Sequence, residues 1–438
     1  MMALLRRLWR AVPLRLFFVS LAIYALTAGA SLNRHSLAPH FVYLAESFLH
    51  GRLDLLHVPA PPYDLTPFEG GWYVSFPPLP SLLMLPLVAL WGLAVSDVAF
   101  SVVMGALSVS LFYTVLLRLD VGRWTSDVGN RTPGTEIWLC LLLGLGTPLW
   151  YCAALGSVWY TAHVVAVACL CLYALEALGR NRPLWSGLWL GLGFLARPPV
   201  LLAFPLALGL GLRNSAVWKQ CLRENGRFLL LLALGAAPAL LGQAAYNWIR
   251  FDNPLEFGYR WMNSPGPLLE RQAAWGQFSL HFLPENLYTL LIRPPLVSLS
   301  PLHVEPDPWG MGLLFSCPAL LLALETGFLS LRAKQKHLLV SVRIRPALWL
   351  SVLLVQLPSL LYFNTGSYQF GCRFALDWLP LGVLLVALGT GRRLRWWGKT
   401  LIVASAMMHL WGVLWMYPNF NGQPWRIQYV EMLRHLLP

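Results

Sequence analysis

The polar residues best suited to chemistry cluster in one stretch of this chain, between residues 32 and 78. Its acids and histidines are His35, His40, Glu46, His50, Asp54, His57, Asp64 and Glu69. Such side chains commonly act as general bases or bind metal ions. Their spacing matches no metal motif such as HExxH, so a divalent metal is left open without a motif to support it. We expect acid–base chemistry from at least one carboxylate. The alternative is a loop that is polar only because it faces water.

Arg197 is a single charge within an apolar run, "WLGLGFLARPPVLLAFPLAL". A charge near the middle of a bilayer costs roughly 2.5–3.5 kcal/mol even on lenient insertion scales, so it normally faces a partner or a watery cavity. The Pro-Pro pair that follows breaks the helix and frees backbone groups at the same place. Arg197 is expected either to bind a lipid phosphate through bidentate hydrogen bonds from its guanidinium or to form a structural ion pair.

Two further positions carry polar groups at the ends of apolar segments. His163 opens the segment 158–178, where it is either a packing residue or part of a site. Arg373 and Asp377 stand four residues apart in "CRFALDWLP". On an α-helix this spacing predicts an ion pair. The functional alternative has Arg373 facing a phosphate in the same cavity as Arg197.

The elements that must position these residues are membrane helices. Of the 438 residues, 57% are hydrophobic and 12% are charged, whereas soluble domains carry roughly 25% charged residues. Apolar runs long enough to cross a roughly 30 Å hydrocarbon layer recur along the chain. They lie near 14–31, 79–95, 98–117, 135–152, 158–178, 185–212, 228–248, 309–330, 347–362, 373–389 and 400–417. We predict an all-α, polytopic transmembrane bundle of about 11–13 helices, forming one integral-membrane domain over residues 1–438.

The net charge of +13 comes from basic clusters between the apolar segments. Under the positive-inside rule these clusters are cytoplasmic loops, so the charge indicates topology and not a nucleic-acid partner. The N-terminus is then cytoplasmic, and the two large loops 32–78 and 249–308 are extracytoplasmic. We expect the plasma or inner membrane as the location. The clusters are Arg6, Arg7, Arg10 and Arg15; Arg180 and Arg182; Arg213, Lys219, Arg223 and Arg227; Arg332, Lys334, Lys336, Arg343 and Arg345; Arg392, Arg393, Arg395 and Lys399.

In one region the loops do not alternate between the two sides of the membrane as successive crossings require. The loop 118–134 is cytoplasmic by its arginines, but alternate crossing from the first segment places it outside. We therefore expect one segment between residues 94 and 160 not to span fully. The first loop has its own pattern, because apolar residues between 41 and 56 follow helical spacing. This predicts an amphipathic helix in the membrane interface, with Glu46 and Arg52 turned to water.

The layout resembles the GT-C superfamily of integral-membrane glycosyltransferases, especially the family-39-like branch of protein O-mannosyltransferases and aminoarabinose transferases. The similar stretches are "YLAESFLHGRLDL" (43–55), the Pro77-Pro78 pair that ends the first loop, "GLWLGLGFLARPP" (187–199) and "CRFALDWLP" (372–380). The resemblance implies many helices, a large first extracytoplasmic loop with interfacial helices, and a sugar donor carried on a polyprenyl phosphate.

The chain departs from that family at the catalytic motif. Family members carry an acidic pair four and three residues before the tyrosine that corresponds to Tyr43, and here those positions are Pro39 and His40. The Glu-Lys before the Pro-Pro pair is replaced by Ser75 and Phe76. Another acid of the loop must then act as the base. Our order of candidates is Asp64, then Asp54, then Glu46.

The expected function is transfer of a sugar from a polyprenyl-phosphate donor to a hydroxyl of a lipid, glycan or protein, on the extracytoplasmic side. The expected substrate-binding residues are Arg197, Arg373, His40, His163 and Tyr43. Membrane lipids are the other partners. Two alternatives stay open: a transporter or flippase of lipid-linked sugars, which needs the arginines but no base, and a non-catalytic member of the family.

Overall fold

The computed structural model describes residues 11–120, 134–212, 218–299, 302–324, 341–366, 368–390 and 394–421. Parts of the basic loops used to assign sides, including 1–10, 325–340 and 391–393, lie outside the described residues. So do most of the loop 118–134 and the tail 422–438.

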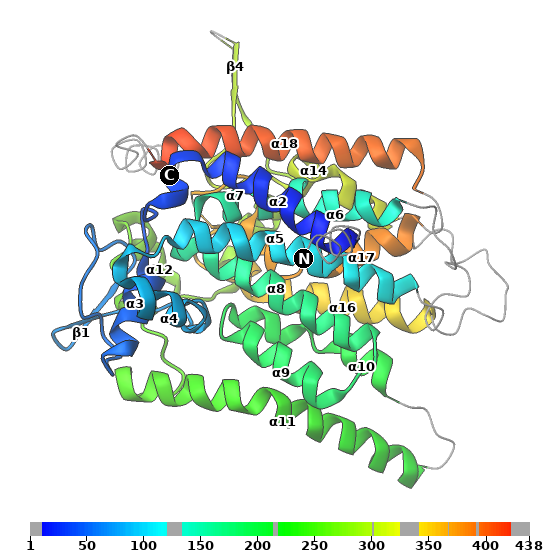
Figure 1. Cartoon of the computed structure of the whole chain (residues 1–438), viewed down its shortest axis with the longest axis horizontal. Coiled ribbons are helices and arrows are strands. Elements are labelled where there is room, and N and C mark those ends of the chain that lie inside the picture. The colour runs from blue at the N-terminus through cyan, green and yellow to red at the C-terminus, as the bar shows by residue number, and fades with distance from the viewer. Residues whose placement is uncertain are drawn as a thin grey trace, which may run out of the picture.

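Helices are the main elements of the described chain and strands are few and short, which confirms the predicted all-α bundle (Figure 1). The α-helices are α2 (Val12–Ala28), α3 (His40–Leu49), α4 (Leu79–Trp91), α5 (Asp97–Asp120), α6 (Thr135–Leu145), α7 (Leu149–Leu155), α8 (Val158–Leu178), α9 (Pro183–Phe194), α10 (Pro205–Gly211), α11 (Trp218–Phe251), α12 (Gly266–Trp275), α13 (Leu283–Leu291), α14 (Leu313–Ser316), α16 (Ser341–Leu360), α17 (Leu379–Thr390) and α18 (Trp396–Asn421). The 3₁₀ helices are η1 (Gly29–Asn33), η2 (Gly92–Ala94), η3 (Pro198–Ala203), η4 (Tyr259–Trp261), η5 (Leu280–Phe282), η6 (Pro318–Leu324) and η8 (Arg373–Asp377).

Several of these helices can cross a membrane. Within the described residues, five are long and apolar enough, and the pair α6 and α7, bent by 53° at its break, makes a sixth if it is one span. Four shorter apolar helices accompany them. The chain is therefore a multi-pass membrane protein. Helix α8 is its central element, since 83% of its apolar window is buried, while α11 and α18 lie at opposite edges (Figure 1).

Two apolar elements in or beside the region where the sides failed to alternate are short or bent. Helix α4 with its 3₁₀ extension ends at Ala94 after starting at Leu79, which makes it about 24 Å long and shorter than a roughly 30 Å hydrocarbon layer. The α6–α7 pair is bent at Thr147-Pro148. This pair lies between residues 94 and 160, where one segment was expected not to span fully, and α4 lies just before that region.

The segment 185–212 is interrupted at the expected place. Helix α9 stops at Phe194, Arg197 is extended, and the chain resumes as η3 from Pro198. Helix α9 packs closely on α11 through glycine: a Cβ added at Gly187 would lie 2.0 Å from the Leu232 carbonyl oxygen of α11. Small residues of this kind let membrane helices approach each other closely, and here they hold the broken end that carries Arg197.

The two large loops fold against each other at one end of the bundle. In the first loop, β1 (Thr66–Phe68) pairs antiparallel with β2 (Gly71–Tyr73), with Thr66 opposite Tyr73. In the second, β3 (Leu296–Leu299) pairs with β4 (Leu302–Glu305), and this hairpin projects beyond α18 (Figure 1). A helix forms in the first part of the stretch 41–56 as α3, which ends at Leu49, buries Phe41 and Leu44 and packs against α4.

Candidate functional site: a charged cavity between the two loops and the bundle

A cavity of about 1100 Å³ lies where the two large loops meet α8, α9 and η8. Its wall includes Asp64 from the first loop, Ser264 from the second, and Trp159 and His163 from α8. Arg197 lines the same space. Aromatic and proline side chains form much of the remaining wall, as in many small-molecule sites. The cavity therefore combines a few charged groups with a largely apolar lining.

Asp64 is held on the cavity wall by contacts from α8 and from the second loop. Its backbone has a φ of 50°, in the left-handed region that Asp and Asn tolerate better than other non-glycine residues. Trp159 donates from Nε1 to Oδ2 at 2.6 Å, and Ser264 donates from Oγ to Oδ1 at 3.0 Å. Backbone bonds between the loops, from Asp64 to Asn263 at 3.1 Å and from Asn263 to Leu65 at 2.8 Å, fix this position.

The environment of Asp64 favours its neutral form. Desolvation raises the pKa of this carboxyl above its usual value, and the hydrogen bonds from Trp159 and Ser264 and the charge of Arg373 oppose part of that rise. A carboxylate that keeps free lone pairs and has a raised pKa is suited to accept a proton.

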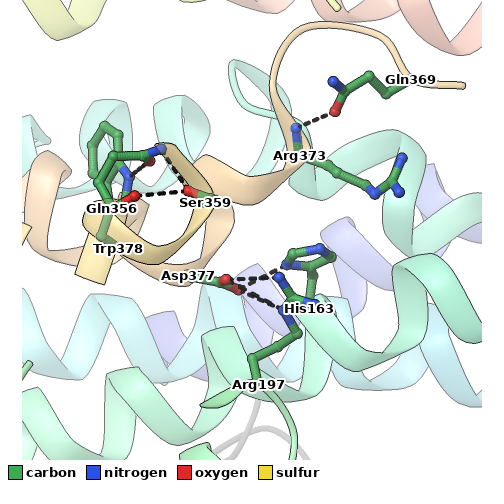
Figure 2. A network of polar contacts seen from close by, with 8 residues as sticks. All are labelled: His163, Arg197, Gln356, Ser359, Gln369, Arg373, Asp377 and Trp378. Atoms are coloured by element: carbon green, nitrogen blue, oxygen red, sulfur yellow. Dashed lines mark hydrogen bonds and ion pairs between the residues drawn. The ribbon is translucent and has the colours of Figure 1, made fainter. Parts of the chain in front are cut away.

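Asp377 is the centre of a second polar cluster (Figure 2). Its Oδ1 contacts His163 Nδ1 at 2.8 Å. Arg197 donates to it from Nε at 3.2 Å to each oxygen and from Nη2 to Oδ2 at 3.1 Å. Three distant segments thus meet at one carboxylate that is only 2% exposed. The ion-pair alternative for Arg197 is realised, with Asp377 as the partner.

The ion pair expected between Arg373 and Asp377 does not form. Residues 373–377 are a 3₁₀ helix, with three residues per turn, so the fourth residue along lies roughly 120° away around the axis. The Arg373 side chain points away from Asp377 (Figure 2) and donates from Nη1 to the Gly366 carbonyl. Its backbone N–H donates to Gln369 Oε1 at 2.9 Å.

Arg373 is the least compensated charge on the cavity wall. It is 5% exposed, and its Nε has no hydrogen-bond partner among the described residues. Across the described ranges, no carboxylate lies within 4.0 Å of its guanidinium. Its neighbours are the rings of Tyr160 and Phe374, whose centroids lie 5.6 and 5.2 Å from Cζ. A buried, unpaired guanidinium that opens on a cavity is a natural anion site.

The other two candidate bases lie outside this cavity. Asp54 pairs with Arg52 at 2.5 Å, and Glu46 contacts His57 Nδ1 at 2.9 Å. Neither carboxylate lines the cavity. The sequence ranks Asp64 first among the three candidate bases. Of these three, only Asp64 lines the same cavity as Arg197 and Arg373.

His40 and Tyr43 do not line the cavity either. His40 is fully buried, and its Nε2 contacts the Tyr63 carbonyl oxygen at 2.6 Å. Burial lowers the pKa of His40 to about 4, so the imidazole is neutral near pH 7. Because Tyr63 precedes Asp64, this contact helps to hold the Asp64 backbone in place. Tyr43 packs against the apolar cluster of the first loop.

Two contacts of Asp64 were not expected from the sequence. Trp159 stands four residues before His163 on α8, so helical spacing places both on one face of the helix. Ser264 has no comparable signal, because it reaches Asp64 through a loop contact between residues 200 positions apart. For metals, the described part of the chain contains no group of three or more His, Cys, Asp or Glu side chains that could hold an ion.

Comparison of this chain with protein-family models, with curated proteins and with solved structures finds no match. What the fold and the cavity define is a multi-pass, all-α membrane protein with acidic and basic groups lining one cavity. Any assignment of function depends on that geometry.

Proposed function

We propose that this protein is a membrane glycosyltransferase that moves a sugar from a polyprenyl-phosphate donor to a hydroxyl acceptor on the extracytoplasmic side of the plasma or inner membrane. The observation that carries the proposal is that Asp64, Arg197 and Arg373 line one cavity. A base and a phosphate site must face each other across the reacting carbon in such a transfer.

The basic wall suits the phosphate of the donor. Arg373 has no carboxylate neighbour within the described residues, so its charge is available to a phosphate. Arg197 lies on the same wall, although its charge is shared with Asp377. Apolar side chains such as Phe194, Leu201 and Leu202 line another part of the cavity and suit an isoprenoid chain.

Asp64 suits the acceptor. It takes the proton from the acceptor hydroxyl as that oxygen bonds to the anomeric carbon of the sugar. The bond between the anomeric carbon and the phosphate oxygen breaks, and its electron pair leaves with the polyprenyl phosphate. Arg373 and Arg197 stabilise the negative charge that collects on that phosphate. A lipid, a glycan or a protein can supply the hydroxyl.

The test is transfer of a labelled sugar from polyprenyl-phosphate donors by the purified full chain. We expect D64N to lose at least ~10²-fold in rate, since general-base catalysis contributes about 10²–10⁴-fold. It should still bind polyprenyl phosphate. R373A should weaken that binding by about 10-fold or more, because it removes a charge-assisted hydrogen bond.

Two matched variants serve as controls. D54N changes another acid of the same loop, and R260A changes an exposed arginine of the second loop. Both should behave as the wild type. Unchanged transfer by D64N would overturn Asp64 as the base. Movement of the donor across vesicles with no transfer, equally in D64N and wild type, would show a transporter instead.

A further inference from the structure

The His163 side chain on the cavity wall also has a buried nitrogen without a hydrogen-bond partner among the described residues. His163 is 1% exposed and lines the cavity. Its Nδ1 is engaged by Asp377, whereas its Nε2 makes no hydrogen bond within the described residues. The two ring nitrogens of an imidazole point in nearly opposite directions, so Nε2 faces away from Asp377 (Figure 2). Buried polar atoms are almost always paired in proteins, so an unpaired one in a cavity indicates a missing ligand group.

The contacts of Asp377 determine what Nε2 can do. An ionised carboxylate only accepts hydrogen bonds, so His163 Nδ1 must carry the hydrogen. The single negative charge of Asp377 is already matched by Arg197, which makes three hydrogen bonds to it. A second proton on the imidazole would leave a buried excess positive charge beside Arg197. The ring therefore stays neutral, and Nε2 presents a lone pair, which requires a hydrogen-bond donor opposite it.

The position of this acceptor is next to the proposed phosphate site. The Phe374 ring is a shared neighbour: its centroid lies 5.8 Å from that of His163, 5.4 Å from Arg197 Cζ and 5.2 Å from Arg373 Cζ. A group that meets His163 while the phosphate meets the guanidinium groups must be close to that phosphate in the donor. In a sugar phosphate, the nearest hydroxyl is on the ring carbon next to the phosphate-bearing carbon.

We propose that His163 Nε2 accepts a hydrogen bond from this hydroxyl of the donor sugar, and that it makes the site selective for donors that carry it. This rests on the proposed function. Asp377 and Arg197 act as positioning residues that hold the imidazole in the required tautomer. A site built to bond a hydroxyl discriminates against the analogue that lacks it, because its own polar group is then left unpaired.

The test compares probes that differ only at this hydroxyl. The probes are short-chain polyprenyl-phosphate glucose, polyprenyl-phosphate mannose, the 2-deoxy compound common to both, and bare polyprenyl phosphate. For the wild type we expect at least one of the two hydroxylated probes to bind ~10-fold or more tighter than the 2-deoxy probe. H163L should bring this ratio of affinities close to one, because it should weaken the binding of the hydroxylated probe alone.

Two variants separate recognition from folding. H163Q keeps an oxygen that can accept a hydrogen bond, so it should retain part of the preference. H409L is the matched control, because His409 is also fully buried, bonded through Nδ1 and unpaired at Nε2 within the described chain, but it is not on the cavity wall. H409L should keep the wild-type ratio even if its stability falls.

The outcomes distinguish this inference from the proposed function. A wild-type ratio near one, a ratio that H163L leaves unchanged, or bare polyprenyl phosphate binding as tightly as the glycosylated probes would overturn the role of His163. Failure of all four probes to bind would overturn the proposed function and the inference with it.

Discussion

Asp64 combines an unusual backbone conformation with two strong donors to its carboxylate. The left-handed φ of 50° turns the side chain onto the cavity wall, where Trp159 and Ser264 hold one oxygen each. Desolvation raises the pKa of Asp64, and the hydrogen bonds from these two donors offset part of that rise. The protonation of Asp64 is therefore set by a balance between its burial and its two neighbours.

This balance predicts a pH effect of W159F. A base works only when deprotonated, so activity should fall as the pH drops through the raised pKa of Asp64. Removing the Trp159 N–H takes away an interaction that lowers this pKa. The acidic limb of the pH–rate profile should therefore move to higher pH.

The control for W159F is S264A, which removes the other donor and should move the limb in the same direction. The alkaline part of the profile should keep most of the wild-type rate in both variants. A limb that stays in place, or that moves to lower pH, would contradict the role of Asp64 as the titrating base.

At the scale of elements, one carboxylate ties the first loop to the ends of two helices. Asp97 begins α5 and is 1% exposed. It accepts hydrogen bonds from the Ser36 N–H at 2.8 Å, from the Ser36 hydroxyl, and from the Ser157 N–H at 3.1 Å. Ser157 is the N-cap of α8, the helix that carries Trp159 and His163.

We therefore predict that D97A destabilises the fold. The substitution leaves buried donors unpaired, at a cost of about 3 kcal/mol, and its effect is measured as a lower thermal midpoint in detergent. E136A is the matched control, since Glu136 is in the first turn of α6. Equal midpoints for D97A and wild type would show that this junction contributes nothing to stability.

The elements were more predictable from the sequence than the contacts among them. Long apolar segments such as 98–117 and 158–178 became α5 and α8 because burial of an apolar run is a local property. The helix break beside Arg197 was predictable as well, because the Pro198-Pro199 pair interrupts a helix locally. The pairing of Asp377 was not predictable, because it depends on residues 373–377 being a 3₁₀ helix and on partners far away in the chain.

Part of the candidate site was also predictable, because residue type and the cost of a charge in an apolar segment are local properties. Residue type and position ranked Asp64 above Asp54, and the two arginines followed from the cost of charge in an apolar segment. The donors to Asp64 come from α8 and from the second loop, 95 and 200 residues away. Only the folded chain brings such groups together, and no local pattern encodes them.

At the scale of the whole molecule, the sidedness of the loops decides where the cavity opens. The second loop carries the exposed Ser298 on its projecting hairpin, and the opposite end of the bundle carries the exposed Arg180 after α8. By the positive-inside rule we predict that the first is extracytoplasmic and the second cytoplasmic. The six cysteines with described side chains are all buried, so they interfere little with surface labelling.

Labelling of single introduced cysteines checks this topology. A membrane-impermeant maleimide added to intact cells should modify S298C and not R180C, and permeabilised cells should show both modified. The unsubstituted chain is the control for background labelling. The reverse pattern would place the cavity on the cytoplasmic side and exclude an extracytoplasmic transferase.

The shared carboxylate of Asp377 also constrains how this protein can change over generations. His163 and Arg197 lie on segments far apart from Asp377 in the chain, yet both bond to its carboxylate. Loss of Asp377 would leave both without their shared partner, whereas loss of His163 or of Arg197 would leave the other two still paired. Descendants of this sequence that keep His163 and Arg197 should therefore keep Asp377 as well.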